Sequence, residues 1–471
     1  MAAATQPREE RAQLDVQSAD DNTLISGSEQ KVRLAGSLRP RFQVTAWAAA
    51  RSSSAVFGKI FNRKEELAAL NEVFDDSPSE LLIVLGPANC GKTKLLQEVK
   101  KDRELGQAVI GEGPPPILYL NCRKKDISSP QQFANAIREL VTKDTAFGKW
   151  WKAVKLKFPY IQVDLGTLFG PADDPAPPMA SIIASLTACL EAIRPLPYKP
   201  VIIIDEANVL LDWHDDPGRT QLKALLRFFV ATTKEDHLGH FVLASSESFV
   251  IDFLEKEGLH TKQYVTQEIG DLATIDEAKQ FVESLMLCKT APSSFFDRTE
   301  NGEQIDMWPR VYEICGGNIG LLERCAKHSN RLKSWEAGLK WVSRDLEGAV
   351  KRGLWPGGFS RAGGSRFPAA WTKENYKTVL REIALAKKHK HAVSFDKLED
   401  AAGEAALLSM VEWNLVALRR KSEWAKDLPE TVFADLDDDK LATMPSPAEL
   451  YFVLKMYEAG KLDAAPPNDD K

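Results

Sequence analysis

Residues 86–93 have the types and spacing of a phosphate-binding loop. Their pattern is G-x-x-x-x-G-K-T, in which two glycines let the backbone turn so that successive N–H groups face an anion. The lysine of this pattern reaches the β- and γ-phosphates of a nucleotide, and the final hydroxyl holds Mg²⁺. The predicted nucleotide-binding residues are Gly86, Pro87, Ala88, Asn89, Cys90, Gly91, Lys92 and Thr93, with Lys92 also catalytic and Thr93 also a metal ligand.

The flanking residues predict the elements that position this loop. Leu81–Leu85 is a short apolar run that ends in Gly-Pro, which is typical of a buried strand entering a turn. A helix is expected over Lys92–Lys101, and its N-terminus adds partial positive charge beside the phosphates. We include Lys94, in the first turn of that helix, among the binding residues. The alternative is a plain glycine turn with a surface lysine.

A second apolar run ends in two carboxylates. Val201–Ile204 is entirely β-branched, as expected for a central strand of a parallel sheet, and Asp205 and Glu206 follow it. Ligands of open α/β sheets bind at the carboxyl ends of such strands. We therefore expect Asp205 to hold Mg²⁺ through water and Glu206 to orient or deprotonate the attacking water. The alternative is an acid pair that caps the next helix.

A further strand, Phe241–Ala244, is followed by Ser245 and Ser246. Their hydroxyls are candidates for polarising the γ-phosphate or its water, which would make both residues catalytic. Serines at such a position are equally common as caps of a following helix, here expected over Phe249–Lys256. Both interpretations stay open at this point.

Composition sets broad limits on function. The chain has 471 residues, is 44% hydrophobic and 27% charged, and carries a net charge of -6, which gives no indication of non-specific nucleic-acid binding. No apolar run has the eighteen or so residues of a membrane span, so a soluble protein without membrane contact is expected. The six cysteines lack zinc spacing and indicate reduced thiols of an intracellular compartment. Cys90, beside Lys92 and a helix N-terminus, is either a reactive thiolate or a small loop residue.

Five regions are expected along the chain. Residues 1–57 have few large apolar residues and are interpreted as flexible. Their acid-free, arginine-containing stretch from Gln30 to Lys64 leaves organelle targeting and a plain tail as alternatives. The others are an ATPase core over 58–270, a helical lid over 271–352, a glycine-rich linker over 353–370 and a C-terminal domain over 371–471. Within the core, residues 146–178 are expected to form an irregular insertion with Trp150 and Trp151 in its interior.

The C-terminal region, 371–471, has a pattern of three helices, a strand pair and a last helix, which suggests a winged helix. Such a domain often binds DNA, but this region contains 15 Lys and Arg against 19 Asp and Glu, a net of -4. The clusters Lys387–His391 and Arg419–Lys421 favour DNA, whereas the acidic run Asp435–Asp439 opposes it. A protein partner or a contact within the chain is favoured, with DNA as the alternative.

Several segments together resemble the archaeal-type ATPase family, which lies among the signal-transduction ATPases with numerous domains and close to AAA+ proteins and replication initiators. The matching segments are Phe61–Leu67, Gly86–Thr93, Ile203–Glu206, Ala244–Ser246, Thr274–Ala278 and Gly316–Asn318. The resemblance implies an α/β fold with a five-stranded parallel sheet, a helical lid and a winged helix, with ATP and Mg²⁺ bound between core and lid. On this resemblance we add Phe61 and Arg63 to the nucleotide-binding residues.

Two departures from the family pattern bear on mechanism. Ile319 stands where the family usually has proline, which leaves the lid contact open, and no arginine follows Ala244–Ser246, so Arg219 and Arg227 are the candidate arginine fingers. Two functions remain. One is a Mg²⁺-dependent ATPase whose turnover moves the lid; the other is a nucleotide-gated scaffold or initiator-like DNA binder with little turnover. Oligomerisation is compatible with both.

Overall fold

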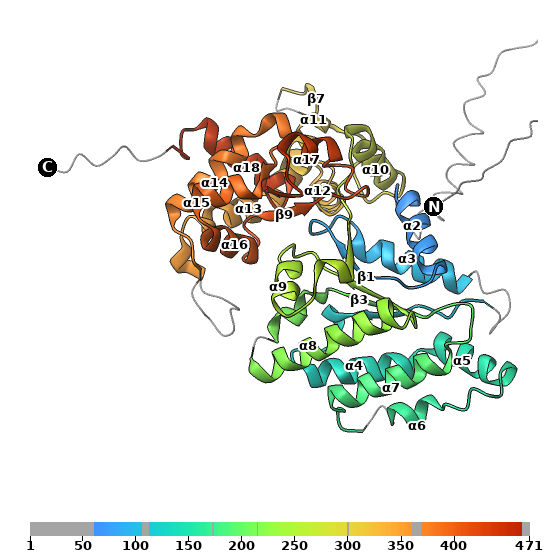
Figure 1. The fold of residues 1–471 in the computed structure, drawn as a ribbon. Helices are drawn as coiled ribbons and strands as arrows, with labels where there is room; N and C mark the ends of the chain where they lie inside the picture. Colours follow the sequence, from blue (N-terminus) through green and yellow to red (C-terminus); the bar gives the residue numbers. More distant parts are fainter. Residues whose placement is uncertain are drawn as a thin grey trace, which may run out of the picture. The chain divides into compact units, whose positions relative to one another are not determined.

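A five-stranded parallel sheet carries the phosphate-binding loop (Figure 1). The computed structural model describes residues 61–105, 113–171, 174–213, 215–298, 301–359 and 369–463, so the predictions for residues 1–57 lie outside the described part. The strand order is β2-β3-β4-β1-β5, and every neighbouring pair is parallel, as predicted. The strands are β1 (Leu81–Leu85), β2 (Leu118–Asn121), β3 (Val201–Asp205), β4 (His240–Ala244) and β5 (Tyr264–Glu268).

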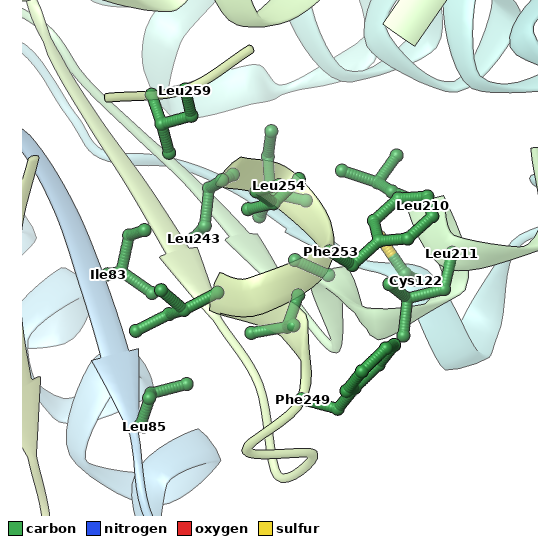
Figure 2. Close-up of a cluster of buried hydrophobic side chains, with 14 of the residues drawn as sticks. Ile83, Leu85, Cys122, Leu210, Leu211, Leu243, Phe249, Phe253, Leu254 and Leu259 are labelled. Atoms are coloured by element: carbon green, nitrogen blue, oxygen red, sulfur yellow. The ribbon is translucent and has the colours of Figure 1, made fainter. Parts of the chain in front are cut away.

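β1, β3 and β4 are buried along their whole length because helices cover both faces of the sheet. On one face, Leu82 and Val84 pack with α2 (Lys64–Asp75) and α3 (Lys92–Leu105). On the other, alternate residues pack with a second set of helices. These are α4 (Pro130–Lys143), α7 (Met179–Ala192), α8 (Asp216–Val230) and α9 (Val250–Lys256). Figure 2 shows part of this layer, where Ile83 and Leu243 face Phe253 and Leu254 of α9.

The segment 146–178, predicted to be irregular, contains two helices, α5 (Thr145–Lys157) and α6 (Leu165–Phe169). Asp144 starts α5 by accepting the N–H of Phe147 at 2.9 Å. An apolar stripe at helical spacing then runs from Phe147 through the twin tryptophans. Trp150 and Trp151 are 1% and 2% exposed, which confirms their predicted place in the interior. The proline-rich stretch 171–178, which is typical of irregular structure, follows α5 and does not interrupt it.

The start of α2 also differs from expectation. Asn62 is of a residue type that favours N-caps, but the N-cap is Arg63, without a side-chain cap bond. Asn62 instead has a left-handed backbone, with φ of 51°, and its amide donates to Glu277 Oε1 at 2.8 Å. Val73 of the same helix is 41% exposed although it is apolar. Tertiary contact with the lid therefore overrides the local capping signal.

The next region has a core of its own around Trp308 and Trp335. Its elements are α10 (Ile275–Leu287), β6 (Phe296–Arg298), β7 (Gln304–Asp306), α11 (Trp308–Cys315), α12 (Ile319–Leu332) and α13 (Trp335–Gly353). The antiparallel pair β6–β7 was not predicted. The box of Thr274 and Glu277 caps α10 as its sequence indicates.

The C-terminal region combines five helices with a three-stranded antiparallel sheet of order β8-β10-β9. Two of these strands match the predicted pair, and the third, β8, is only two residues long. The elements are α14 (Lys373–Leu385), β8 (Val393–Ser394), α15 (Phe395–Ala402), α16 (Glu404–Glu412), β9 (Ala417–Arg420), α17 (Glu430–Leu436), β10 (Lys440–Thr443) and α18 (Pro447–Glu458). Winged helix remains an interpretation of this set, and the domain boundaries stay predictions.

Short helical turns complete the connections. They are η1 (Cys122–Lys124), η2 (Ala207–Asp212), η3 (Ala231–Glu235), η4 (Thr261–Gln263), η5 (Pro356–Phe359) and η6 (Lys387–His389). Of these, η1 begins directly after β2, and η2 begins directly after Asp205 and Glu206. Across the described ranges, no helix combines the length and the apolar character that a membrane span requires.

Candidate functional site: a phosphate loop at the carboxyl edge of the sheet

The loop after β1 depends on its two glycines. Gly86 has φ of +146°, and a Cβ there would lie 2.1 Å from the carbonyl oxygen of Ile269. Gly91 has φ of +106°, which side chains rarely tolerate. The next residue, Lys92, begins α3, so the helix N-terminus opens directly at the loop.

Lys92 lies folded within the loop. Its Nζ donates to the carbonyl oxygens of Gly86 at 2.8 Å and Pro87 at 2.9 Å. The side chain is buried, so these carbonyls satisfy a charge that would otherwise be costly to remove from water. The ammonium is thus held where the glycine-rich backbone would receive phosphates.

Thr93 and Asp205 meet across the sheet edge. The Thr93 hydroxyl donates to Asp205 Oδ2 at 2.8 Å, although the two residues lie far apart in sequence. The same carboxylate oxygen accepts from the hydroxyl of Tyr119 at 2.5 Å and the amide of Asn121 at 3.1 Å. Asp205 is only 1% exposed, and these donors compensate for its burial.

Tyr119 and Asn121 are site residues that sequence reasoning missed. Both lie on β2, whose register with β3 places Asn121 opposite Asp205. The sequence signal that could have identified them is the ending Tyr-Leu-Asn of β2. Because parallel strands end at the same edge of a sheet, polar residues at this ending lie near the acids that follow a neighbouring strand. Burial and the Asp205 contact raise the pKa of Tyr119, so its hydroxyl stays protonated as a donor.

Glu206 forms an ion pair with Arg123, a residue that the sequence analysis also missed. Its Oε2 lies 3.0 Å from the guanidinium of Arg123 in η1, and Ser246 Oγ donates to the same oxygen at 3.4 Å. Its backbone is left-handed, with φ of 62°, an uncommon conformation that turns the chain into η2 directly after the strand. Burial raises the pKa of Glu206, and Arg123 opposes this shift.

The two serines after β4 differ in their contacts. Ser245 is buried, and its hydroxyl bonds the backbone N–H and carbonyl of Glu247 at 3.0 Å and 3.2 Å. Neither serine caps α9, which has Phe249 as N-cap without a side-chain bond, so the capping alternative is wrong. Only Ser246 contacts another candidate site residue. The turn of Ser245 positions the peptide that carries Ser246.

Arg63 supports the loop from its backbone side. Its guanidinium donates to the carbonyl oxygen of Gly270 at 2.5 Å and approaches that of Cys90 at 3.4 Å. It also pairs with Glu66 at 2.8 Å, and both side chains are nearly fully buried. Phe61 lies apart from these groups and packs edge-on against Phe281 of α10. Lys94 lies on the exposed side of α3.

Cys90 is not the reactive thiolate that its neighbours suggested. Its side chain is 0% exposed and packs among the apolar residues between α3 and the sheet. Burial raises the pKa of the Cys90 thiol more strongly than Lys92 lowers it. The structure supports the other alternative, in which Cys90 is a small residue that fills the loop.

The Gly-Gly-Asn turn before α12 contacts the loop. Asn318 donates to the carbonyl of Ala88 at 3.0 Å and to Asp271 Oδ1 at 2.9 Å, and it also caps α12. Gly320 N–H donates to the carbonyl of Asn89 at 3.2 Å. The contact forms although Ile319 stands where the family has proline, because it uses flanking backbone and the Asn318 amide.

The basic residues of β9 turn toward the ATPase core. Arg419 bonds the carboxylates of Glu268 at the end of β5 and of Asp427, the latter at 3.0 Å and 3.1 Å. Arg420 donates its N–H to Glu268 at 2.7 Å and lies 3.8 Å from Asp252. Two residues of the cluster Arg419–Lys421 therefore serve contacts within the chain, as the favoured interpretation expected.

Neither candidate arginine finger reaches the loop. Arg219 bonds Glu257 of the same region at 2.7 Å and 2.8 Å. Arg227 is exposed in the last turn of α8.

The oxygen donors at the loop fit a hard divalent cation. Thr93 supplies a hydroxyl and Asp205 a carboxylate, and Mg²⁺ usually takes one or two such ligands with water and substrate phosphates. The described residues contain no cluster of three or more His, Cys, Asp or Glu that could hold a metal ion.

Comparisons with known proteins agree with this geometry. A sequence model of ATPase domains predominantly from Archaea matches residues 60–324, more than half of the 471 residues. The chain belongs to this family of ATPase domains. An uncharacterized ATP-binding protein of Pyrococcus abyssi is 26% identical over 282 residues, which cover 58% of this chain and 74% of that protein.

Other relatives and a solved structure extend the comparison. An ATP-binding protein of Methanocaldococcus jannaschii is 26% identical over 211 residues, 42% of this chain and 53% of its own. The chain thus spans about half the length of such relatives. The Walker-type ATPase of Pyrococcus abyssi has a TM-score of 0.50 at 17% identity, covering 84% of this chain and 96% of that one, which shows a shared fold. Together these findings confirm the resemblance and the fold class.

Proposed function

We propose that this protein binds ATP with Mg²⁺ and hydrolyses it, and that its nucleotide state is transmitted to the lid and the C-terminal region. The observation that carries the proposal is the meeting of Thr93 and Asp205 at 2.8 Å beside the buried ammonium of Lys92. Lys92 and Thr93 at the start of α3 and Asp205 at the end of β3 thereby converge on one phosphate cradle.

The loop residues divide the work of binding. Backbone N–H groups of residues 86–91 and the N-terminus of α3 receive the phosphates. Lys92 exchanges its carbonyl partners for phosphate oxygens, while Thr93 and Asp205 hold the cation. When bound, Mg²⁺ would neutralise negative charge on the nucleotide phosphates. Tyr119 and Asn121 fix the Asp205 carboxylate, so its orientation does not depend on the cation.

Glu206 is the candidate base for the attacking water. Its carboxylate lies between Arg123 and Ser246, which orient it and offset its burial. Because burial raises its pKa, it is a better proton acceptor than an exposed glutamate. Ser246 is the remaining candidate for polarising the water or the γ-phosphate.

The segment Glu268–Asp271, which begins with the last residue of β5, supports the proposed coupling. Arg419 holds its first residue, Trp424 accepts the N–H of Gly270 at 3.3 Å, and Asn318 holds its last residue. Asn318 also bonds the loop itself. A cavity of about 130 Å³ beside this segment is lined by Pro87 of the loop and by C-terminal residues that include Arg419 and Asp427. A loop displaced by nucleotide would therefore disturb all three regions together.

The runner-up function is a nucleotide-gated scaffold with little turnover. The observation that favours it is the Arg123–Glu206 pair itself, because a carboxylate engaged by a guanidinium is less available as a base. Under this alternative, binding would be retained and hydrolysis would stay near background.

Titration calorimetry of the full chain with ATP and Mg²⁺ tests the proposal. Lys92→Ala removes the charge held in the cradle, and a charge-assisted contact is worth about 1.5–3 kcal/mol. We expect the affinity for ATP to fall at least about tenfold. Equal affinity in parent and variant would contradict the assignment of the loop. Binding by the parent without phosphate release in a turnover assay would instead favour the scaffold.

A further inference from the structure

A second cavity, of about 510 Å³, lies away from the phosphate loop. It is formed by the end of α13, the start of α14 and the last turns of α18, and α13 and α14 each pack against α18 (Figure 1). Its size falls within the roughly 300–1,000 Å³ typical of ligand sites. None of the residues assigned above to nucleotide binding or hydrolysis lines it.

Lysines dominate the lining of this cavity. The lining residues include five lysines and one carboxylate, Glu347, and two further carboxylates, Glu374 and Glu458, pair with two of these lysines. These groups together carry a net charge of +2 in a chain whose total is -6. The five lysines are Lys351, Lys373, Lys377, Lys455 and Lys461. A concave surface lined by one sign of charge concentrates ligands of the opposite sign. The cavity is therefore basic although the chain as a whole is acidic.

The lysines are available to a ligand. Lys351 pairs with Glu347 at 2.6 Å and Lys455 with Glu458 at 3.0 Å, and both are exposed pairs of the kind that contribute little energy. Lys377 is the exception, because its side chain is only 17% exposed and lies 3.8 Å from Glu374. Lys373 and Lys461 form no ion pair with any residue that the structure describes. An incoming anion would thus replace weak contacts or none.

An exposed indole borders the same cavity. Trp355 is 66% exposed, and the Lys373 ammonium lies 5.4 Å from the centre of its ring. Apolar groups of Leu354, Phe452 and Met456 line the cavity beside it. A groove lined by lysines with an exposed aromatic face is the arrangement with which proteins bind single-stranded nucleic acid, because bases stack on the ring and phosphates contact the cations. An acidic peptide would use the lysines but leave the indole without a stacking partner.

We propose that the cavity between α13, α14 and α18 binds single-stranded nucleic acid, with a base stacked on Trp355 and phosphates at Lys373 and Lys461. The site joins the lid to the C-terminal region because α13 belongs to the former and α14 and α18 to the latter. The opposite end of α18 lies at the lid turn, where a Cβ on Gly316 would be 2.7 Å from Pro447. This assignment does not depend on hydrolysis at the phosphate loop.

Fluorescence anisotropy of a labelled twelve-nucleotide oligothymidylate with the full chain tests the site. Trp355→Ala should weaken binding roughly 5- to 150-fold, the loss expected when one base–aromatic stack is removed. The double variant Lys373→Ala/Lys461→Ala should reduce the slope of log affinity against log salt by about 1.4, or 0.7 for each lost phosphate contact. Unchanged affinity and slope in these variants would overturn the proposal.

A matched double variant controls for general charge effects. Lys149→Ala/Lys152→Ala removes the same charge from exposed positions of α5, beside another cavity. It should bind the oligonucleotide like the parent. Loss of binding in this variant instead would place the site on α5 and overturn the assignment. Competition by polyglutamate as strong as by unlabelled oligonucleotide would identify an acidic protein segment as the occupant.

Discussion

Arg123 in the turn after β2 lies 3.0 Å from Glu206 at the end of β3. Because the guanidinium lowers the pKa of Glu206 against the effect of burial, Arg123→Ala should raise that pKa. A base must be deprotonated, so the acidic limb of the kcat profile should move to higher pH. Arg123→Lys, which keeps a charge, is the control. A profile that stays in place in Arg123→Ala would show that Glu206 is not the titrating base.

The two strand-end acids should separate binding from hydrolysis. Glu206→Gln keeps the size of the side chain but removes the base, so phosphate release should fall by roughly 10² or more while calorimetric affinity for ATP persists. Asp205→Asn should weaken nucleotide and Mg²⁺ binding together, because Asp205 is bonded to Thr93. Turnover at the parent rate in Glu206→Gln would assign the pair a structural role.

Gly320 should be intolerant of a side chain although it lies in a helix. A Cβ there would be 2.3 Å from Cβ of Asn89 in the phosphate loop. Gly320→Ala should destabilise the protein by about 1–3 kcal/mol through overpacking and should lower ATP affinity by displacing the loop. Gly348→Ala in α13, where no atom lies within 4 Å of the added Cβ, is the control and should be neutral or stabilising. Equal melting temperatures for the two variants would contradict the close contact.

Glu449 on α18 should make stability depend on pH. Burial raises its pKa from 4.5 to about 7, whereas Ser446 lowers it less. A carboxyl whose pKa is raised by folding stabilises the native state only while protonated, so this stability is lost as pH rises from 4.5 through 7. Glu449→Gln should therefore raise the free energy of unfolding at pH 8 by up to about 3 kcal/mol, and the melting temperature with it. At pH 4.5 the substitution should change neither quantity.

Glu458→Gln on the same helix provides the control for this pH effect. Its side chain is 63% exposed, so the substitution should change little at either pH. A Glu449→Gln variant whose melting temperature differs from the parent equally at pH 4.5 and 8 would argue against an ionised buried carboxylate.

The sequence by itself determined the elements whose signals are local. The glycine spacing of residues 86–93 allows few other structures, and the apolar runs Leu81–Leu85 and Val201–Ile204 are too short and too β-branched for helices. Acids at the end of a central strand must lie at the ligand-binding edge, whatever the rest of the chain does. These features predict a phosphate-binding loop on a parallel sheet, whereas the number of strands and the lid were expected from the family resemblance.

Only the tertiary structure decided which side chains surround the predicted groups. Tyr119, Asn121 and Arg123 became neighbours of the acid pair because β2 pairs in register with β3, and the sequence contains no record of strand order. Packing likewise made Cys90 an inert thiol, since burial outweighs the nearby Lys92 charge. Arg419 lies in a sequence cluster that resembles a DNA-binding patch, but its partner Glu268 is supplied by a distant strand. Charge patterns report composition along the chain, whereas pairing depends on which segments meet in space.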